Sequence, residues 1–239
     1  CLLHGAPSSG KTEIFLHLIL DTLRAGRQAL YLLPEIALTT QMTERLADVL
    51  GPRLLVYHSG LTDRERAEVW RRLLRTDSEP AVVVGVRSSL FLPFDRLGLI
   101  VVDEEHEPSY KQNDLAPRYH ARNAALMLAR MHGARALLGS ATPSLETYYL
   151  ARTGRYGLVT LTERYGAAPE PEIVLVDTKE LRRKRRMKFD ALLSPPLREA
   201  IDSALAEGRQ TILFRNRRGY APVMECRSCG YVPRCAYCD

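Results

Sequence analysis

The sequence predicts an α/β fold, with a parallel sheet covered by helices on both faces, followed by the start of a second α/β unit. Short, continuously apolar runs alternate with amphipathic runs, which is the pattern of such a sheet. The polar motifs stand directly after the apolar runs, at the strand ends where parallel sheets bind ligands. We therefore divide the chain into a first lobe at 1–165, the start of a second lobe at 166–222 and a cysteine-rich segment at 223–239.

Strands are expected where short apolar runs stand between turn signals, and helices where apolar residues recur every three to four positions. In the first lobe, a strand ending at Leu2-Leu3 is followed by strands at 28–33, 53–57, 81–86, 99–102 and 135–138. The expected helices are 12–23, 36–50, 62–75 and 121–131. In the helix at 62–75, we expect Trp70 and Leu74 to face the core beside Val69 and Leu73.

The second lobe is predicted to begin with a strand at 172–176. Pro195 and Pro196 then open a helix that ends near Glu207, because proline is well tolerated in a first helical turn. A strand at 210–214 follows. A basic run from Arg182 to Lys188 lies between the first strand and the helix, and we interpret it as a solvated linker, with contact to DNA as the alternative.

A glycine-rich loop between the first strand and the first helix fits the phosphate-loop pattern G-x-x-x-x-G-K-[ST]. Its residues are Gly5, Ala6, Pro7, Ser8, Ser9, Gly10, Lys11 and Thr12. Glycines let successive backbone N–H groups turn toward phosphate oxygens, and the following helix directs the positive end of its dipole to the same anion. Lys11 is expected to reach the β- and γ-phosphates of ATP, and the Thr12 hydroxyl to ligate Mg²⁺.

The bulk composition is that of an ordinary globular protein, with 46% hydrophobic and 26% charged residues. No apolar run approaches the ~20 residues of a membrane span, and no signal peptide is visible. The net charge of +6 hints at an anionic partner such as nucleic acid, the alternative being a basic surface without function. Because the chain lacks an initiator Met and Asp239 directly follows the last cysteine, we expect it to be a fragment.

An acidic motif follows the strand predicted at 99–102. In an ATPase with a phosphate loop, the first acid holds Mg²⁺ and the second polarises the water that attacks the γ-phosphate, so we assign these roles to Asp103 and Glu104. His106 is interpreted either as a link between the nucleotide and other motifs or as a simple hydrogen-bonding neighbour. A solvated acidic loop is the alternative for the whole motif, and the phosphate loop in the same chain argues against it.

The tripeptide Ser140-Ala141-Thr142 ends the strand predicted at 135–138. Small hydroxyl residues at a strand end can bridge the acidic motif to a DNA-binding side through hydrogen bonds that change with nucleotide state. Helix capping is the alternative, and Pro143-Ser144 suits it. Together with Asp103-Glu104-Glu105-His106, the tripeptide forms the combination seen in superfamily 2 helicases.

The chain resembles one branch of that superfamily, the bacterial primosomal replication-restart helicases. The matching stretches are 5–13, 33–39, 57–61, 85–91, 103–106, 109–112, 117–122, 139–144 and 216–220. The resemblance implies a RecA-like lobe of a DNA-dependent ATPase that unwinds duplex DNA 3′ to 5′ at abandoned replication forks and helps to reload the replicative helicase. It further implies primosome proteins and single-stranded DNA-binding protein as partners, a monomer, and a cytoplasmic, nucleoid-associated location in a bacterium.

The resemblance also implies regions outside this sequence. They are an amino-terminal DNA-binding region, the rest of the second lobe with its arginine finger, and a carboxy-terminal domain. Without them, we expect the chain to bind nucleotide and to turn it over little. The phosphate loop departs from the family, because Ala6-Pro7-Ser8 replaces the more usual Val-Thr-Gly. The loss of a glycine is expected to stiffen the loop or to alter nucleotide affinity.

The polar loop 107–120 resembles the aromatic-rich loop with which the family senses DNA. Its Tyr110 and Tyr119 are candidates for stacking on bases, whereas Lys111, Arg118 and Arg122 are candidates for phosphate contacts. An ordinary surface loop is the alternative for any one of them. Arg87 follows a predicted strand and is expected either to contact the DNA backbone or to pair with a carboxylate.

Four cysteines form two C-x-x-C pairs near the carboxyl end, namely Cys226 with Cys229 and Cys235 with Cys238. Pairs with this spacing can bind one tetrahedral Zn²⁺, and their clustering favours metal over disulfides and fits a reducing cytosol. The gap of five residues between the pairs is short for a single four-cysteine site. The resemblance implies that the pairs belong to two different zinc sites, so we expect this segment to be disordered or improperly metallated in the fragment.

Two other functions remain open. One is a DNA-binding primosome scaffold whose motor has decayed, which the altered phosphate loop favours and the intact Lys11, Asp103 and Glu104 oppose. The other is a duplex DNA translocase that does not separate strands. The cysteine pairs and the loop from Tyr110 to Tyr119 favour the restart helicase over it.

Overall fold

The computed structural model describes residues 1–37, 40–75, 79–113, 116–164, 172–184, 193–214 and Cys229. The chain forms two compact units, Cys1–Pro169 and Glu170–Asp239. The lobe boundary predicted at 165/166 falls outside the described residues and stays a prediction, as does the boundary predicted at 222/223.

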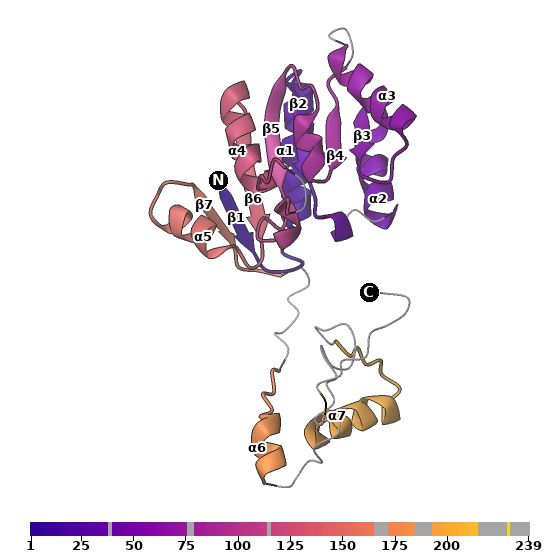
Figure 1. The fold of residues 1–239 in the computed structure, drawn as a ribbon, viewed down its shortest axis with the longest axis vertical. Helices are drawn as coiled ribbons and strands as arrows, with labels where there is room; N and C mark the ends of the chain where they lie inside the picture. Colours follow the sequence, from indigo (N-terminus) through magenta and orange to yellow (C-terminus); the bar gives the residue numbers. More distant parts are fainter. Residues whose placement is uncertain are drawn as a thin grey trace. The chain divides into compact units, whose positions relative to one another are not determined.

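A seven-stranded sheet forms the first unit, with strand order β3-β4-β2-β5-β6-β1-β7 (Figure 1). The strands are β1 (Leu2–Gly5), β2 (Gln28–Leu32), β3 (Leu54–Tyr57), β4 (Val82–Gly85), β5 (Leu97–Val102), β6 (Arg135–Ser140) and β7 (Leu158–Leu161). Every neighbouring pair is parallel, which confirms the predicted sheet. All carboxyl ends therefore lie at one edge, and β6 stands between the strand that carries the phosphate loop and the strand that carries the acids.

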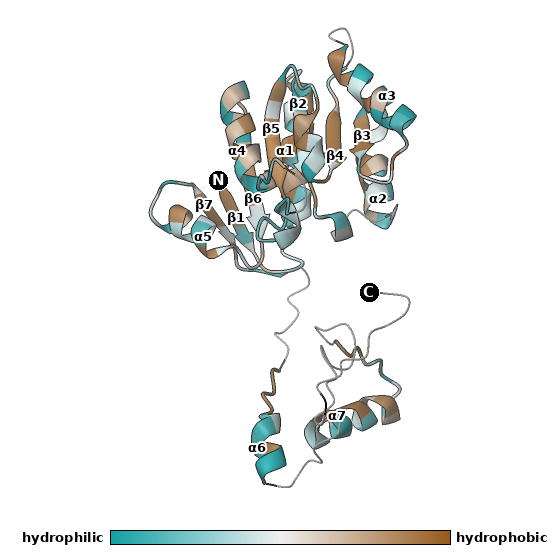
Figure 2. Cartoon of the chain, in the orientation of Figure 1, coloured by the Kyte–Doolittle hydropathy of each residue, from teal (hydrophilic) through white to brown (hydrophobic). Residues whose placement is uncertain are grey.

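Helices cover both faces of this sheet. They are α1 (Lys11–Arg24), α2 (Thr40–Leu50), α3 (Asp63–Leu74), α4 (Ala121–His132) and α5 (Leu145–Arg152). Successive side chains along β2 alternate between two apolar clusters, because the side chains of a strand point alternately to opposite faces. Leu30 and Leu32 pack in the cluster that contains residues of α3, α4 and α5. Ala29 and Tyr31 pack in the cluster that contains residues of α1 and α2. Figure 2 shows β4 and β5 largely in the brown of hydrophobic residues.

Short 3₁₀ turns also lie at or beside strand ends in this unit. They are η1 (Glu35–Ala37), η2 (Gly51–Arg53), η3 (Arg87–Phe91) and η4 (Pro108–Tyr110). The turn η1 accounts for one difference from the sequence prediction, because the helix expected at 36–50 consists of this turn and the separate helix α2. The strand β7 and the helix α5 were not predicted from the sequence.

The prediction for the buried face of α3 was half right. Val69 and Leu73 are buried, but the exposed fractions of Trp70 and Leu74 are 44% and 57%. A stripe of four adjacent apolar residues is wider than the surface that one helix buries against a sheet, so its outer positions remain in water. The predicted amino end of this helix is confirmed, because Thr62 and Glu65 form a capping box.

The second unit contains α6 (Thr178–Arg183) and α7 (Pro195–Ala206). The helix that Pro195 and Pro196 were expected to open is therefore confirmed. The strands predicted at 172–176 and 210–214 were wrong, because neither segment has a strand assignment in the structure. A strand needs hydrogen-bonding neighbours, and these segments have none in the part of the chain that the structure describes. Their apolar side chains are exposed, for instance Leu175 at 92% and Ile212 at 94%.

The basic run falls partly in α6, which ends at Arg183, whereas residues 185–188 lie outside the described residues. Among the described residues, none of the helices is both long and apolar enough to cross a membrane.

Candidate nucleotide-binding and catalytic site

The phosphate loop leaves β1 at Gly5 and enters α1 at Lys11. Two of its residues have positive φ angles, 59° at Ser8 and 86° at Gly10. Glycine adopts this conformation freely, whereas a residue with a side chain is strained in it. Ser8 stands where the resembling family more usually has glycine, so the departure noted in the sequence falls on a position whose backbone favours glycine.

The loop closes around its own lysine. The Lys11 ammonium donates hydrogen bonds to the carbonyl oxygens of Gly5 and Ala6, at 2.8 and 3.1 Å. Gly139 of β6 lets α1 pack close behind the loop, because a Cβ there would lie 2.4 Å from the ring of Phe15. The glycine that precedes Ser140 therefore has a packing role.

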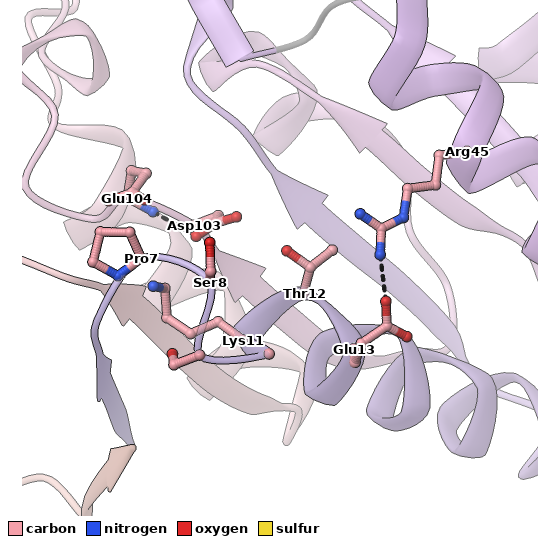
Figure 3. Close-up of a pocket in the computed structure, with 10 residues that line it drawn as sticks. Pro7, Ser8, Lys11, Thr12, Glu13, Arg45, Asp103 and Glu104 are labelled. Atoms are coloured by element: carbon pink, nitrogen blue, oxygen red, sulfur yellow. Dashed lines mark hydrogen bonds and ion pairs between the residues drawn. The ribbon is translucent and has the colours of Figure 1, made fainter. Parts of the chain in front are cut away.

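A cavity of about 730 Å³ opens above the loop (Figure 3). It is lined by Pro7, Ser8, Ser9, Gly10, Lys11, Thr12, Glu13, Arg45, Asp103 and Glu104. Six of the eight predicted loop residues thus line the cavity, and the other two, Gly5 and Ala6, accept the hydrogen bonds of Lys11. Both predicted acids line the same cavity, although roughly ninety residues separate them from the loop in sequence.

Asp103 is held in a fixed orientation at the end of β5. The Tyr31 hydroxyl donates to its Oδ2 at 3.0 Å, and the Glu104 backbone N–H donates to its Oδ1 at 2.9 Å. Burial raises the pKa of Asp103, and the neighbouring Glu104 carboxylate raises it further. Sequence reasoning missed Tyr31, which looks like any buried strand residue in the apolar run of β2.

Glu104 adopts a φ of 45°, a left-handed conformation that is uncommon for a residue with a side chain. The chain turns sharply there, so that Glu104 lines the cavity beside Asp103 while Glu105 is fully buried. Backbone strain of this kind is concentrated at functional sites.

His106 connects the acidic motif to the end of β6. Its Nδ1 lies 2.8 Å from the Ser140 hydroxyl and 3.5 Å from a carboxylate oxygen of Glu104. The Thr142 hydroxyl lies 3.4 Å from His106 Nε2, and the Thr142 backbone N–H donates to Ser140 Oγ at 3.0 Å. The structure thus brings together the residues that the sequence analysis named as a bridge. Ser144, by contrast, caps α5.

Glu105 forms a second cluster that sequence reasoning missed. Its carboxylate accepts hydrogen bonds from the Arg122 guanidinium at 2.7 Å, the Ser144 backbone N–H at 2.7 Å and the Thr147 hydroxyl at 2.9 Å. The Ser144 hydroxyl lies 3.1 Å from the same carboxylate. Burial alone would raise the pKa of Glu105, but these hydrogen bonds outweigh it and lower the pKa. We call Glu105, Arg122, Ser144 and Thr147 the Glu105 clasp.

The clasp changes the interpretation of Arg122, which was a candidate for phosphate contacts. Its guanidinium side chain is only 11% exposed and pairs with a carboxylate that is 0% exposed. The ion pair is therefore internal, and nothing in the local sequence links two residues that stand seventeen positions apart.

Tyr110 was a candidate for stacking on bases, with an ordinary surface loop as the alternative, and the structure contradicts both because the ring is buried. The ring is 1% exposed, and its hydroxyl contacts the backbone oxygens of Asp103 at 2.6 Å and Leu32 at 3.1 Å. A tyrosine in a polar loop is usually expected at the surface. Here the Tyr110 ring packs in the core, and its hydroxyl contacts backbone carbonyl groups at two strand ends. The Tyr110 hydroxyl therefore helps to hold the backbone of the acidic motif in place at Asp103.

Arg87 was expected to contact DNA or a carboxylate, but it holds the loop 107–120 instead. Its guanidinium donates to the backbone oxygens of Ser109 at 3.0 Å and Lys111 at 3.2 Å. The Lys111 ammonium in turn donates to the Arg118 carbonyl at 2.6 Å. These contacts hold the segment around Ser109 and Lys111 against η3 and join Lys111 to Arg118.

Tyr119 and Arg118 stay closer to solvent. The ring of Tyr119 is partly exposed and packs edge-on against Phe91, with 5.1 Å between ring centroids. Its hydroxyl donates to the Arg87 carbonyl at 3.3 Å. Arg118 is exposed. Among the described candidates for DNA contact, Arg118 and Tyr119 therefore remain accessible to a ligand such as DNA, and the exposed Phe91 lies beside Tyr119.

Most of the predicted zinc ligands lie outside the described residues, namely Cys226, Cys235 and Cys238. Cys229 is described, and it is exposed and has a free thiol. Within the described ranges, no group of three or more His, Cys, Asp or Glu side chains is placed to hold a metal ion.

The model of one protein family, "DEAD/DEAH box helicase", matches residues 1–150. The chain belongs to this family. Family membership implies the use of a nucleotide and Mg²⁺, and the oxygen donors Thr12 and Asp103 fit the preference of Mg²⁺ for oxygen ligands.

Among curated proteins, the replication restart protein PriA of Bacillus subtilis is 46% identical over 239 residues, which cover 100% of this chain and 29% of that protein. PriA of Rickettsia felis is 44% identical over 238 residues and is covered to 36%. PriA of Haemophilus influenzae is 42% identical and is covered to 31%. The chain thus spans about a third of the length of these relatives, and their similarity along all of it confirms the resemblance to replication-restart helicases.

Among solved structures, RecG bound to a three-way DNA junction matches with a TM-score of 0.53 at 22% identity, over 77% of this chain and 24% of that chain. At this level of identity the match shows the fold alone. It supports the RecA-like architecture expected for the first lobe.

Proposed function

We propose that this chain carries the ATP-driven motor of a replication-restart DNA helicase. The single observation on which the proposal depends is the cavity that joins Lys11 and Thr12 of the phosphate loop to Asp103 and Glu104. Similarity to PriA along the whole chain supports the restart function in particular.

Four residues of the cavity receive a role in the proposed ATP hydrolysis, namely Lys11, Thr12, Asp103 and Glu104. Lys11 exchanges the carbonyls of Gly5 and Ala6 for the β- and γ-phosphates of ATP. Thr12 and Asp103 would hold Mg²⁺, which neutralises charge on the phosphates when bound. Glu104 accepts a hydrogen bond from the attacking water and polarises it. Tyr31 and the Glu104 backbone N–H keep the Asp103 carboxylate oriented in the meantime.

His106, Ser140 and Thr142 are proposed to transmit the state of the nucleotide to the DNA-binding side. In support of this, His106 contacts Glu104 and both hydroxyl residues at the end of β6. A change at the γ-phosphate that moves Glu104 alters these contacts directly. Loop 107–120 is proposed to respond to DNA through Tyr119 and Arg118, because both are accessible.

The finer features of the proposal follow from the family. They are 3′ to 5′ unwinding at abandoned forks, assembly of the primosome, contact with single-stranded DNA-binding protein, a monomeric state and a cytoplasmic, nucleoid-associated location. We also propose that the cysteine pairs Cys226/Cys229 and Cys235/Cys238 bind zinc, with the pairs divided between two sites. Zinc analysis with thiol titration tests this, and one well-defined zinc bound by all four thiolates would overturn the division.

The proposal is tested first by nucleotide binding. Isothermal titration calorimetry with ATP and Mg²⁺ should detect binding to the chain, and Lys11→Ala should weaken it at least tenfold, because Lys11 supplies the cation for the β- and γ-phosphates. Lys179→Ala, which changes an exposed lysine of the second unit, is the matched control and should bind as the parent does. Equal affinity of the parent and Lys11→Ala would contradict the site.

Helicase function is tested in a hybrid protein, in which this chain replaces the matching segment of Bacillus subtilis PriA. We expect the hybrid protein to hydrolyse ATP when a model fork is added and to displace a strand, and Lys11→Ala to abolish both while sparing fork binding. Hydrolysis without strand displacement would favour a duplex translocase.

The strain at Ser8 favours a second candidate, a DNA-binding scaffold with a decayed motor. Ser8 has a left-handed backbone conformation, which glycine adopts more easily than a residue with a side chain. Fork binding by the hybrid protein without any hydrolysis would support this candidate. Recovery of hydrolysis by Ser8→Gly would assign the defect to that position.

A further inference from the structure

Two charged side chains of the cavity, Arg45 and Glu13, have no role in the scheme above. Arg45 lies on α2, and it forms an ion pair with Glu13 in the first turn of α1. Both residues line the nucleotide cavity. Neither belongs to the phosphate loop or to the acidic motif, and the sequence gives no reason to connect them.

The charges that line the cavity make Arg45 distinctive. The lining contains the carboxylates of Glu13, Asp103 and Glu104, and the cations Lys11 and Arg45. A nucleotide brings several further negative charges to this space, and Lys11 serves its β- and γ-phosphates. The Glu13 carboxylate would repel an anion bound beside the helix start, unless a cation next to it compensates the charge. Arg45 is that cation.

The position of Arg45 indicates which part of the nucleotide it meets. Figure 3 shows Asp103 and Glu104 at one end of the cavity, Glu13 and Arg45 at the other, and Thr12 between them. The acids mark the end where the γ-phosphate is attacked. The opposite end must accommodate the α-phosphate and the nucleoside, because the phosphate chain extends away from the attacked atom.

The chemistry of the pair allows this contact. The side chains of Arg45 and Glu13 are 58% and 57% exposed, and ion pairs this exposed contribute little to stability. An arginine has five N–H donors in a fixed fork, so it can bind a phosphate while it still touches a carboxylate. Glu13 thus restricts the guanidinium to the cavity rim, which lowers the entropy lost when a phosphate binds.

We propose that Arg45 binds the nucleotide at its α-phosphate end and that Glu13 holds the guanidinium in place, an inference that rests on the proposed nucleotide site. Arg45 is then a nucleotide contact supplied by α2, and Glu13 is a positioning residue. The contact also links bound nucleotide to the helix that follows β2 and η1.

Isothermal titration calorimetry of the chain with two ligands, ADP and the non-hydrolysable analogue AMP-PNP, each with Mg²⁺, tests the inference. Arg45→Ala should weaken both ligands by about tenfold or more, because a charge-assisted hydrogen bond to phosphate is lost. The factor should be the same for both ligands, since they share the α-phosphate end. Arg45→Lys should recover part of the affinity, and Glu13→Gln should weaken binding less than Arg45→Ala does.

The matched control is Arg24→Ala. Arg24 forms an exposed ion pair with Asp21 on α1, the helix that carries Glu13, and both residues lie outside the cavity lining. It should bind both ligands as the parent does, and all variants should keep the melting temperature of the nucleotide-free parent. Affinity of Arg45→Ala within twofold of the parent would overturn the role of Arg45 alone. A larger loss for AMP-PNP than for ADP would overturn its placement at the α-phosphate. A parent chain that binds neither ligand would overturn the nucleotide site and this inference with it.

Discussion

Two neighbouring acidic residues at the end of β5 experience opposite environments. Asp103 lines the nucleotide cavity, with one hydroxyl and one backbone N–H donating to its carboxylate. Glu105 is fully buried in the Glu105 clasp, with an arginine, a backbone N–H and hydroxyl groups around it. Burial acts on both, yet the pKa of Asp103 is raised and that of Glu105 is lowered. Burial by itself thus does not fix the pKa of an acid, because the donors around its carboxylate decide the direction.

The acids that line the cavity and the acid of the Glu105 clasp also differ in whether they serve the proposed function or the stability of the fold. Asp103 and Glu104 line the cavity, where the proposed metal ion and water molecule can reach them. The acid of the clasp has its partners within the protein, and it ties the acidic motif to α4 and to the start of α5. A motif of consecutive acids therefore has a side that faces the cavity, where we propose catalysis, and an anchoring side, and the sharp turn at Glu104 divides them.

The largest expected difference between the two sides is in turnover. In the hybrid protein, Glu104→Gln should lower fork-stimulated ATP hydrolysis by about 10²- to 10⁴-fold, because the water loses its general base. Glu105→Gln is the matched control on the anchoring side and should lower hydrolysis by less than about tenfold, since no reacting atom touches Glu105. Steady-state hydrolysis with a saturating model fork measures both. An equal loss in the two variants would remove the distinction between the sides.

The next effect is in stability and concerns the clasp alone. Arg122→Ala should lower the free energy of unfolding of the first unit by about 3–5 kcal/mol, because it leaves the Glu105 carboxylate buried without its cation. Arg118→Ala, an exposed arginine of the neighbouring loop, should change it by less than about 0.5 kcal/mol. Urea unfolding followed by circular dichroism measures both values. If Arg122→Ala unfolded like Arg118→Ala, Arg122 would be free for the phosphate contacts first expected of it.

The smallest expected effect is a change in the free energy of unfolding that depends on pH and has opposite signs for variants of the two acids. At neutral pH, Asp103→Asn should raise the free energy of unfolding, because ionised Asp103 is disfavoured by burial and by Glu104, whereas Glu105→Gln should lower it. The benefit of Asp103→Asn should fade as pH falls through the raised pKa of Asp103. The deficit of Glu105→Gln should be complete above the ordinary glutamate pKa of 4.5 and fade only as pH falls through the lowered pKa of Glu105.

Urea unfolding of the parent and both variants from pH 7 downward gives the three stability curves. The curve of Asp103→Asn should lie above that of the parent at pH 7 and join it below the ordinary aspartate pKa of 3.8, whereas the curve of Glu105→Gln should lie below that of the parent at pH 7. Two variants that shift stability in the same direction at neutral pH would show that the donors around each carboxylate do not set its pKa.

The sequence by itself determined the phosphate loop, the order of strands and helices through β6, and the acids at the end of β5. These features are local. A glycine pattern, an apolar run and a helical period are each contained in a short stretch of chain, and their chemistry follows from residue type and spacing. The edge of the sheet at which they meet also followed, because parallel strands place their carboxyl ends together.

Only the tertiary structure decided which partner each polar side chain takes. Tyr110 and Arg122 carry the residue types of a DNA-binding surface, but the structure places them in the core and in an ion pair. Tyr31 contacts Asp103 from 72 positions away, and Arg45 meets Glu13 across 32. Such contacts depend on strand order and on the packing of helices over the sheet, which no single stretch of sequence encodes. The apolar segments at 172–176 and 210–214 show the same limit, since a strand forms only where another segment supplies its hydrogen bonds.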